Sequence, residues 1–261
     1  MGNPTEDFAE LVAGDDAAIP LDEVVLQIAA HAHPGRDIRV VLGQLDALAA
    51  RVPDRAIEGL AERLFVVEGF HGNADDHDDP RNSYLDDVVE RRTGIPISLS
   101  VLMIEVGRRA GIALEGVGMP GHFIVAPVGV DGVWYAPFEH GVRLDRAGAE
   151  RLFTGVHGPG APFRAEYLMP TPKRRIVDRW LLNLQRSLGV RDRRSVAWVL
   201  RLRLRIPDQS PSERHRIATM LGSVGAFTEA AAALDTVASQ VAGDQGEQVT
   251  RQALAFRARG N

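Results

Sequence analysis

Residues 94–112 read Gly-Ile-Pro-Ile-Ser-Leu-Ser-Val-Leu-Met-Ile-Glu-Val-Gly-Arg-Arg-Ala-Gly-Ile, and this stretch decides the fold. Pro96 suits the first turn of a helix because its missing N–H needs no partner there, and Gly111 after two arginines is a typical C-terminal stop. The pattern predicts a helix of about four turns. Apolar residues surround most of it, at positions 97, 99, 101, 102, 103, 104 and 106. Such a helix is enclosed by its domain, so we expect it at the centre of the core.

Short segments with strand character follow this helix. Residues 114–118, 122–128 and 133–138 are rich in β-branched and aromatic side chains. They are separated by a Gly-Met-Pro-Gly turn and by Asp131-Gly132, a dipeptide typical of hairpins. Before the helix, apolar residues recur at helical spacing over 21–29, 41–49 and 57–65. We therefore predict an α+β fold, in which covering helices and a small antiparallel sheet surround a buried central helix.

Five motifs resemble those of a known family. They are residues 65–73 (Phe-Val-Val-Glu-Gly-Phe-His-Gly-Asn), 82–85 (Asn-Ser-Tyr-Leu), 91–99 (Arg-Arg-Thr-Gly-Ile-Pro-Ile-Ser-Leu), 120–123 (Pro-Gly-His-Phe) and 137–138 (Pro-Phe). Over about residues 8–238 the chain resembles the bacterial SirB family. That resemblance implies a transglutaminase-like domain of the papain-like superfamily, followed by helices of the tetratricopeptide type.

The resemblance also implies where a catalytic site would lie. In a thiol-dependent core of this kind, a cysteine in the first turn of the central helix is the nucleophile. A histidine near the start of the next strand is the base, and an aspartate one strand later orients it. The corresponding positions here are Pro96, His122 and Ala136, and the chain contains no cysteine. Only the histidine is retained, so the resemblance implies a degenerate site without thiol chemistry.

Two functions follow from this pattern. The first is a non-catalytic transglutaminase-like protein that acts as an interaction or regulatory module, because nucleophile and orienting acid are both missing. The second is an amide or ester hydrolase, or an acyl transferase, that uses Ser98 or Ser100 with His122. Asn82 and Ser83 would then bind the ligand. Each has a structural alternative: a serine in a first helical turn commonly bonds the local backbone, and Asn82-Ser83 suits a cap for a helix over 84–92. We favour the non-catalytic interpretation.

Metal and cofactor motifs are weak. Residues 71–80 form a polar loop with four aspartates and two histidines, but they lack the glycine and the distal glutamate of a calcium loop, so we interpret them as a solvated acidic turn. Residues 116–121 match a dinucleotide fingerprint by letter, yet a strand pattern follows where a helix would be needed. We predict neither a metal nor a cofactor.

Composition bounds the class of protein. The chain is 45% hydrophobic and 25% charged, which is typical of a globular protein. Its apolar stretches fall short of the ~20 residues that span a bilayer, and its first ten residues contain no apolar signal region. With no cysteine for disulfides, we predict a cytoplasmic protein without membrane segments.

The C-terminal part has a different pattern. No strand signal returns after Thr171, and Leu188-Gly189 recurs as Leu221-Gly222, close to the ~34-residue period of tetratricopeptide repeats. We predict a transglutaminase-like domain over 1–168 and an all-α, tetratricopeptide-like tail over 169–261. The polar residues after Gly243 are expected to fray.

Charge is distributed unevenly. Residues 1–96 contain 20 acidic residues against 8 arginines, whereas residues 171–216 contain 13 basic residues against 4 acidic ones. One interpretation is that the two regions pack against one another or present solvated faces. The other is that an anionic partner, a protein or a nucleic acid, docks on the tail. Few aromatic residues are available to stack on bases, so nucleic acid is the weaker candidate for a partner.

Overall fold

A computed structural model describes residues 2–191 and 193–260. The chain divides into two compact units, one ending at Trp180 and the other beginning at Leu181. The division falls within helix α8 (Lys173–Arg191). The domain limits of 1–168 and 169–261 stay a prediction.

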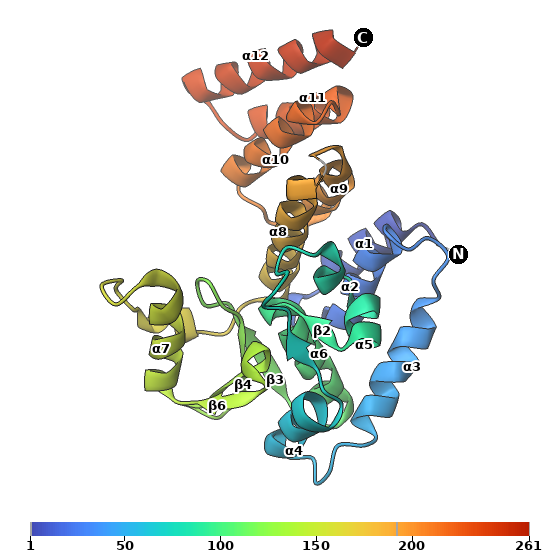
Figure 1. Cartoon of the computed structure of the whole chain (residues 1–261). Helices are drawn as coiled ribbons and strands as arrows, with labels where there is room; N and C mark the ends of the chain where they lie inside the picture. Colours follow the sequence, from blue (N-terminus) through green and yellow to red (C-terminus); the bar gives the residue numbers. More distant parts are fainter. Residues whose placement is uncertain (1, 192, 261) are drawn as a thin grey trace. The chain divides into compact units, whose positions relative to one another are not determined.

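Helix α6 (Pro96–Arg109) is the centre of the first unit, as the sequence predicts. Every residue from Ile97 to Gly107 is buried. Figure 1 shows the elements around it, which are helices α2 (Leu21–Ala30), α3 (Ile38–Ala49), α4 (Ile57–Ala61) and α5 (Leu85–Arg91) and the strands β3 (Leu114–Val117) and β4 (Ile124–Pro127). The apolar residues all around this helix are buried because each of its faces packs against a neighbouring element.

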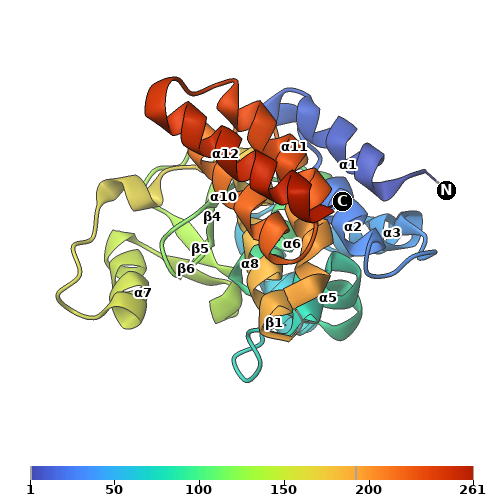
Figure 2. The same cartoon turned by 90° about the horizontal axis from the view of Figure 1, so that it is seen from above.

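The sheet is a four-stranded antiparallel meander in sequence order. Its strands are β3 (Leu114–Val117), β4 (Ile124–Pro127), β5 (Trp134–Ala136) and β6 (Val142–Leu144). Val117 lies opposite Ile124, and Val125 opposite Tyr135. The sheet lies between α6 and α7 (Arg146–His157), as Figures 1 and 2 show. The α+β prediction is confirmed, although β6 was missed because its first two residues are exposed.

The predicted N-terminal helices are present with two differences. Helix α1 (Pro4–Ala13) packs on α2, and the third predicted helix ends in a π-helical turn, η2 (Glu62–Val67). Strands β1 (His71–Gly72) and β2 (Thr93–Gly94) pair in parallel. Residues Pro80–Ser83 form a 3-10 turn, η3, so Tyr84 takes the N-cap position of α5. The prediction that Asn82 and Ser83 cap this helix is therefore wrong.

Among its described residues, the second unit contains only helices and the turns that join them. After η6 (Arg193–Val196) it contains α9 (Ala197–Arg205), α10 (Pro211–Ser223), α11 (Phe227–Ala238) and α12 (Gly243–Gly260). Consecutive helices from α10 to α12 pack on each other. The expectation that residues after Gly243 fray is wrong, because Val249 and Ala253 of α12 are buried against Leu234 and Val237. None of the described helices is both long and apolar enough to cross a membrane.

Candidate functional site

The candidate site begins at the first turn of α6. Pro96 is its first helical residue, and the backbone at Ile95 is extended just before it. Ile95 and Ile97 are buried, whereas Pro96 is partly exposed. The position that the resemblance assigns to a nucleophile therefore reaches solvent. Proline offers neither a reactive side-chain atom nor a backbone N–H there.

Both candidate serines are bonded to the backbone inside the core. Ser98 Oγ donates to the carbonyl of Ile95 at 3.1 Å and accepts its N–H at 2.9 Å. Ser100 Oγ donates to the carbonyl of Phe123 at 3.2 Å and so joins α6 to the sheet. Both serines are 0% exposed. Among the hydrogen bonds of the described residues, neither hydroxyl meets His122, so the structure does not bring these predicted partners together.

His122 lies in the turn between β3 and β4. Gly121 allows this turn by adopting a φ of +73°, a conformation that disfavours other residues. Arg179 of α8 holds the turn, since its Nη2 donates to the carbonyls of His122 at 2.6 Å and Met119 at 2.9 Å. The same guanidinium lies over the ring of Phe123, 5.3 Å from its centroid. The position of His122 is thus fixed from the backbone side.

The imidazole of His122 has one charged neighbour and one free nitrogen. Nε2 lies 3.7 Å from Oε1 of Glu139, within ion-pair distance, and the histidine side chain is only 8% exposed. Nδ1 is buried and has no hydrogen-bond partner among the described residues. The ring of Phe138 meets the imidazole edge-on, with centroids 6.1 Å apart. If Nε2 bears the proton toward Glu139, the lone pair on Nδ1 is an open acceptor.

Burial lowers the pKa of His122, because desolvation disfavours the imidazolium. The charge of Glu139 opposes that shift, while the charges of Arg179 and His77 add to it. The imidazole is therefore mostly neutral at neutral pH. A neutral, buried histidine can accept a proton or a hydrogen bond from a ligand.

Glu139 is the residue that sequence reasoning missed. The orienting acid was expected at position 136, but Ala136 is fully buried at the end of β5. Residues Pro137–Glu139 then form a 3-10 turn, η4, which brings an acid beside His122 three positions later. The side chain of Glu139 is 46% exposed. The sequence does contain a signal for this acid, because Glu139 directly follows the Pro-Phe motif. The prediction missed it because it considered only position 136.

We expect the pKa of His122 to lie below its ordinary value of about 6.5. Glu139→Gln should lower it further, because the neighbouring negative charge is lost. Since folding favours the neutral form, its contribution to stability is present above the ordinary value. That contribution is lost as the pH falls through 6.5 toward the folded-state pKa. NMR titration of the histidine side chains measures both values. A His122 pKa above 6.5, or one that does not change in Glu139→Gln, would contradict the buried environment described for this histidine.

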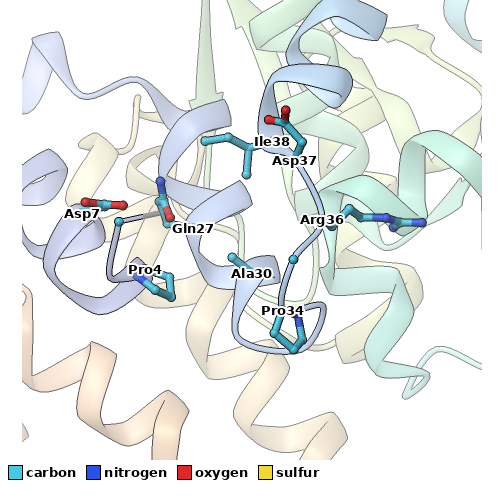
Figure 3. Close-up of a pocket in the computed structure, with 10 residues that line it drawn as sticks. Pro4, Asp7, Gln27, Ala30, Pro34, Arg36, Asp37 and Ile38 are labelled. Carbon is cyan, nitrogen blue, oxygen red and sulfur yellow. The ribbon is translucent and has the colours of Figure 1, made fainter.

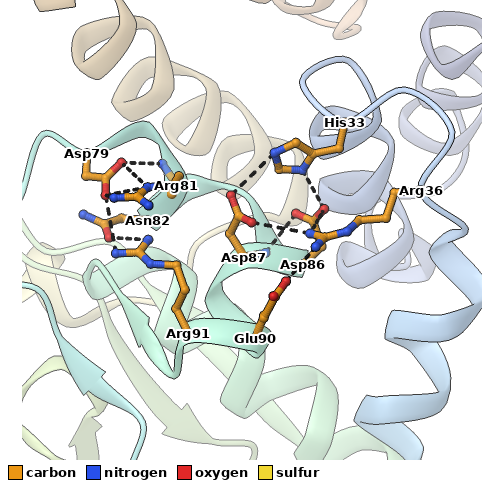
Figure 4. A network of polar contacts seen from close by, with 9 residues as sticks. All are labelled: His33, Arg36, Asp79, Arg81, Asn82, Asp86, Asp87, Glu90 and Arg91. Carbon is orange, nitrogen blue, oxygen red and sulfur yellow. Dashed lines mark hydrogen bonds and ion pairs between the residues drawn. The ribbon is translucent and has the colours of Figure 1, made fainter.

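The side chain of Asn82 makes four hydrogen bonds inside the protein, of which Figure 4 shows the one with Arg91. Its Nδ2 donates to the carbonyls of Asp76 at 2.8 Å and His77 at 3.4 Å. Its Oδ1 accepts from Asn73 at 3.1 Å and Arg91 at 3.4 Å. With 0% exposure, Asn82 holds the polar loop against α5. This places it in a structural network, and its ligand-binding role stays a prediction.

Ser83 is also buried, with 2% exposure. Its carbonyl accepts from Trp180 Nε1 at 3.0 Å, a contact that attaches the start of α5 to α8. The polar loop ends at Asp79, whose carboxylate lies 2.8 Å from Arg81 and 3.4 Å from Arg91. Residues 74–77 are exposed, as expected of a solvated turn, whereas Asp79 is buried and ion-paired.

One cluster has the residue types of a metal site. His33, Asp86 and Asp87 offer ligand atoms within 4.8 Å of one another, and they are the one such group among the described residues. Figure 4 shows that Arg36 enters the same cluster. Its Nη1 lies 2.7 Å from Asp86 and 3.4 Å from Asp87, and its Nη2 lies 2.6 Å from Glu90. A guanidinium already pairs with these carboxylates, so the arrangement is that of an ion-pair network between α5 and the segment before α3.

A cavity of about 320 Å³ lies elsewhere in the first unit, between α1, α2 and the segment before α3 (Figure 3). Its wall is mainly apolar and includes Pro4, Ala30, Pro34 and Ile38. His122, Glu139 and Pro96 do not line it. The cavity and the His122 region are separate features.

Comparison with known proteins shows which family the chain resembles. A family model described as transglutaminase-like superfamily matches residues 20–182. A UPF0162 protein of Xylella fastidiosa (strain Temecula1) is 37% identical over 224 residues, which cover 79% of each chain. A UPF0162 protein of Vibrio cholerae is 31% identical over 138 residues, 52% of this chain and 51% of the other. The expected transglutaminase-like resemblance is confirmed, and the narrower name SirB stays a prediction.

A shorter similarity reaches into eukaryotes. The human F-box only protein 21 is 45% identical over 56 residues, 22% of this chain and 9% of that protein. No solved structure matches the chain.

Proposed function

Because this chain belongs to the transglutaminase-like superfamily, we propose that it is a non-catalytic member that acts as an interaction or regulatory module. One observation supports this above all others: Pro96 is the first residue of α6. In this proposal Pro96 replaces the catalytic cysteine, and Ala136 replaces the acid that would orient His122.

A proline at this position removes two catalytic elements together. Acyl transfer needs a nucleophile, and it needs N–H donors for the oxyanion that forms in the transition state. In serine proteases the nucleophile's own N–H is one of those donors. Pro96 lacks both groups. The nearby hydroxyls of Ser98 and Ser100 do not restore the nucleophile, since each is buried and donates to a backbone carbonyl.

His122 and Glu139 then serve recognition. A buried, neutral imidazole with a free Nδ1 suits a ligand that presents an N–H or O–H donor. Phe138, partly buried between His77 and His122, adds an apolar surface beside it. A polar group next to an apolar surface is typical of binding sites.

The partner in this proposal is another protein that docks on the helical tail. Large apolar side chains of the second unit reach solvent, among them Leu182 (41% exposed), Val190 (71%) and Leu254 (56%). Exposed apolar residues together with the excess of basic residues over 171–216 favour an acidic, partly apolar protein surface.

An assay of amide chemistry tests the non-catalytic proposal. The full chain is incubated with a glutamine-containing peptide and hydroxylamine, and both ammonia and hydroxamate are measured. We expect no turnover above the buffer control, and no difference between the wild type and His122→Ala. Turnover that His122→Ala abolishes would refute the proposal.

A second candidate is an enzyme of altered mechanism, an amide or ester hydrolase or acyl transferase in which Ser98 or Ser100 works with His122. The observation that favours it is Glu139, because an acid beside a histidine is what general-base catalysis requires. The same assay includes Ser98→Ala and Ser100→Ala. Loss of a measurable turnover in one serine variant but not in the other would identify the nucleophile and support this candidate.

A further inference from the structure

A buried charge network lies toward the end of α6 that is opposite to Pro96. Asp22 of α2 and Glu105 of α6 each have side chains that are 1% exposed. Ionised carboxylates are almost never buried without full compensation, because leaving water costs several kcal/mol for each ion. The burial of two carboxylates in one charge network therefore needs an explanation.

Two arginines provide part of the compensation. Arg109, 13% exposed, pairs with Asp22 and lies 3.3 Å from Oε2 of Glu105. Arg108 lies 2.7 Å from the same Oε2 and 3.5 Å from Oδ2 of Asp22, but its side chain is 54% exposed. Asp46 of α3 also pairs with Arg109, because its Oδ1 lies 2.7 Å from Nε of the arginine. A single well-buried guanidinium is therefore divided among three carboxylates.

The second oxygen of each buried carboxylate lacks a hydrogen-bond partner among the described residues. These two atoms, Asp22 Oδ1 and Glu105 Oε1, are both buried. All arginine contacts go to Oδ2 and Oε2. A proton on one of the carboxyl groups removes a buried negative charge and also supplies a donor where none is present.

We propose that the buried Glu105 carboxyl carries a proton at neutral pH, and that the loss of this proton at higher pH loosens the packing of α2 on α6. The groups that face Glu105 are Asp22 from α2 and Arg108 and Arg109 from α6 itself, with Asp46 of α3 behind Arg109. Among the described residues, no ion pair or hydrogen bond reaches the Glu105 carboxyl from α3, α4, α5 or β3.

The electrostatic environment agrees with this assignment. Burial raises the pKa of Glu105, and the charge of Asp22 raises it further, while Arg108 and Arg109 act in the opposite direction. Since folding raises the pKa, the native state binds a proton that the unfolded chain has released. Stability from this group is complete below the ordinary glutamate value of about 4.3, and it is lost as the pH rises through the folded-state pKa.

The state of the proton can be read directly by NMR. In the full chain with 13C-labelled glutamate, the Cδ signal of Glu105, assigned by its absence in Glu105→Gln, is followed against pH. We expect it at the position of a protonated carboxylic acid at neutral pH, and not at that of a carboxylate. A carboxylate signal from Glu105 at neutral pH would overturn the proposal. If Glu105→Gln does not fold, Asp22→Asn still tests the coupling, because it should move the Glu105 titration to lower pH.

Thermal unfolding and hydrogen exchange test the consequence. The wild-type midpoint should fall with rising pH by about 3–5 °C for each unit by which folding raises the Glu105 pKa, and Glu105→Gln should remove this part of the dependence. In the wild type, amides of α2 should lose protection at high pH. A variant that keeps the wild-type pH dependence, with α2 protection unchanged, would contradict the second half of the proposal.

Discussion

Replacing Arg109 by methionine is expected to lower the free energy of unfolding by about 3–5 kcal/mol, the usual effect of removing one partner from a buried ion pair. Arg109 pairs with the buried Asp22, lies 3.3 Å from Oε2 of Glu105, and donates from Nη1 to the carbonyl of Glu105 at 3.1 Å. Methionine retains the apolar stem but leaves the Asp22 carboxylate with only the more distant Arg108. The midpoint of thermal unfolding should fall by roughly 10 °C.

Arg108→Met is the matched control, since the two arginines are neighbours on α6 and share the same two carboxylates. Its side chain is 54% exposed, so solvent screens its contacts and we expect a loss below about 1 kcal/mol. Urea unfolding followed by circular dichroism measures both variants. Equal losses would show that burial does not distinguish the two arginines and would sink the prediction.

The central helix could be predicted because its signals are local. Pro96, Gly111 and an apolar circumference are all within one segment of the sequence, and helix start, helix end and burial follow from them. Strand β6 could not be predicted in the same way. It has three residues, and it is fixed by pairing with β5 rather than by an alternating pattern of its own.

The candidate site was harder to predict than the fold because its contacts are tertiary. Asn82 looks like a helix cap in the sequence, yet its partners Asn73 and Arg91 each lie nine positions away. Glu139 reaches His122 only because η4 turns the chain after β5. The meeting of Asp22 with Arg109 joins residues that are 87 positions apart. Spacing rules describe one element at a time, so they cannot identify such pairs.

Pro96→Cys is expected to create an unusually reactive thiol. The chain has no cysteine of its own, so each single variant contains one thiol and gives an unambiguous signal. A cysteine at a helix N-terminus has its pKa lowered from about 8.5 to roughly 3.5–7.5. At pH 7 we expect iodoacetamide to alkylate this thiol roughly threefold faster than the thiol of Val190→Cys, a side-chain position that is 71% exposed in the second unit. Ser98→Cys, at a position with 0% exposure, should be nearly inert in the folded protein.

The most direct test of the central claim is the pH dependence of that alkylation rate, measured for Pro96→Cys alone and together with His122→Ala. If Pro96 stands where a nucleophile would face His122, the thiol pKa lies below about 8.5 in the single variant and rises when His122 is removed. An ordinary thiol pKa that does not respond to His122→Ala would contradict this placement, and with it the proposal that a proline has taken the nucleophile's position.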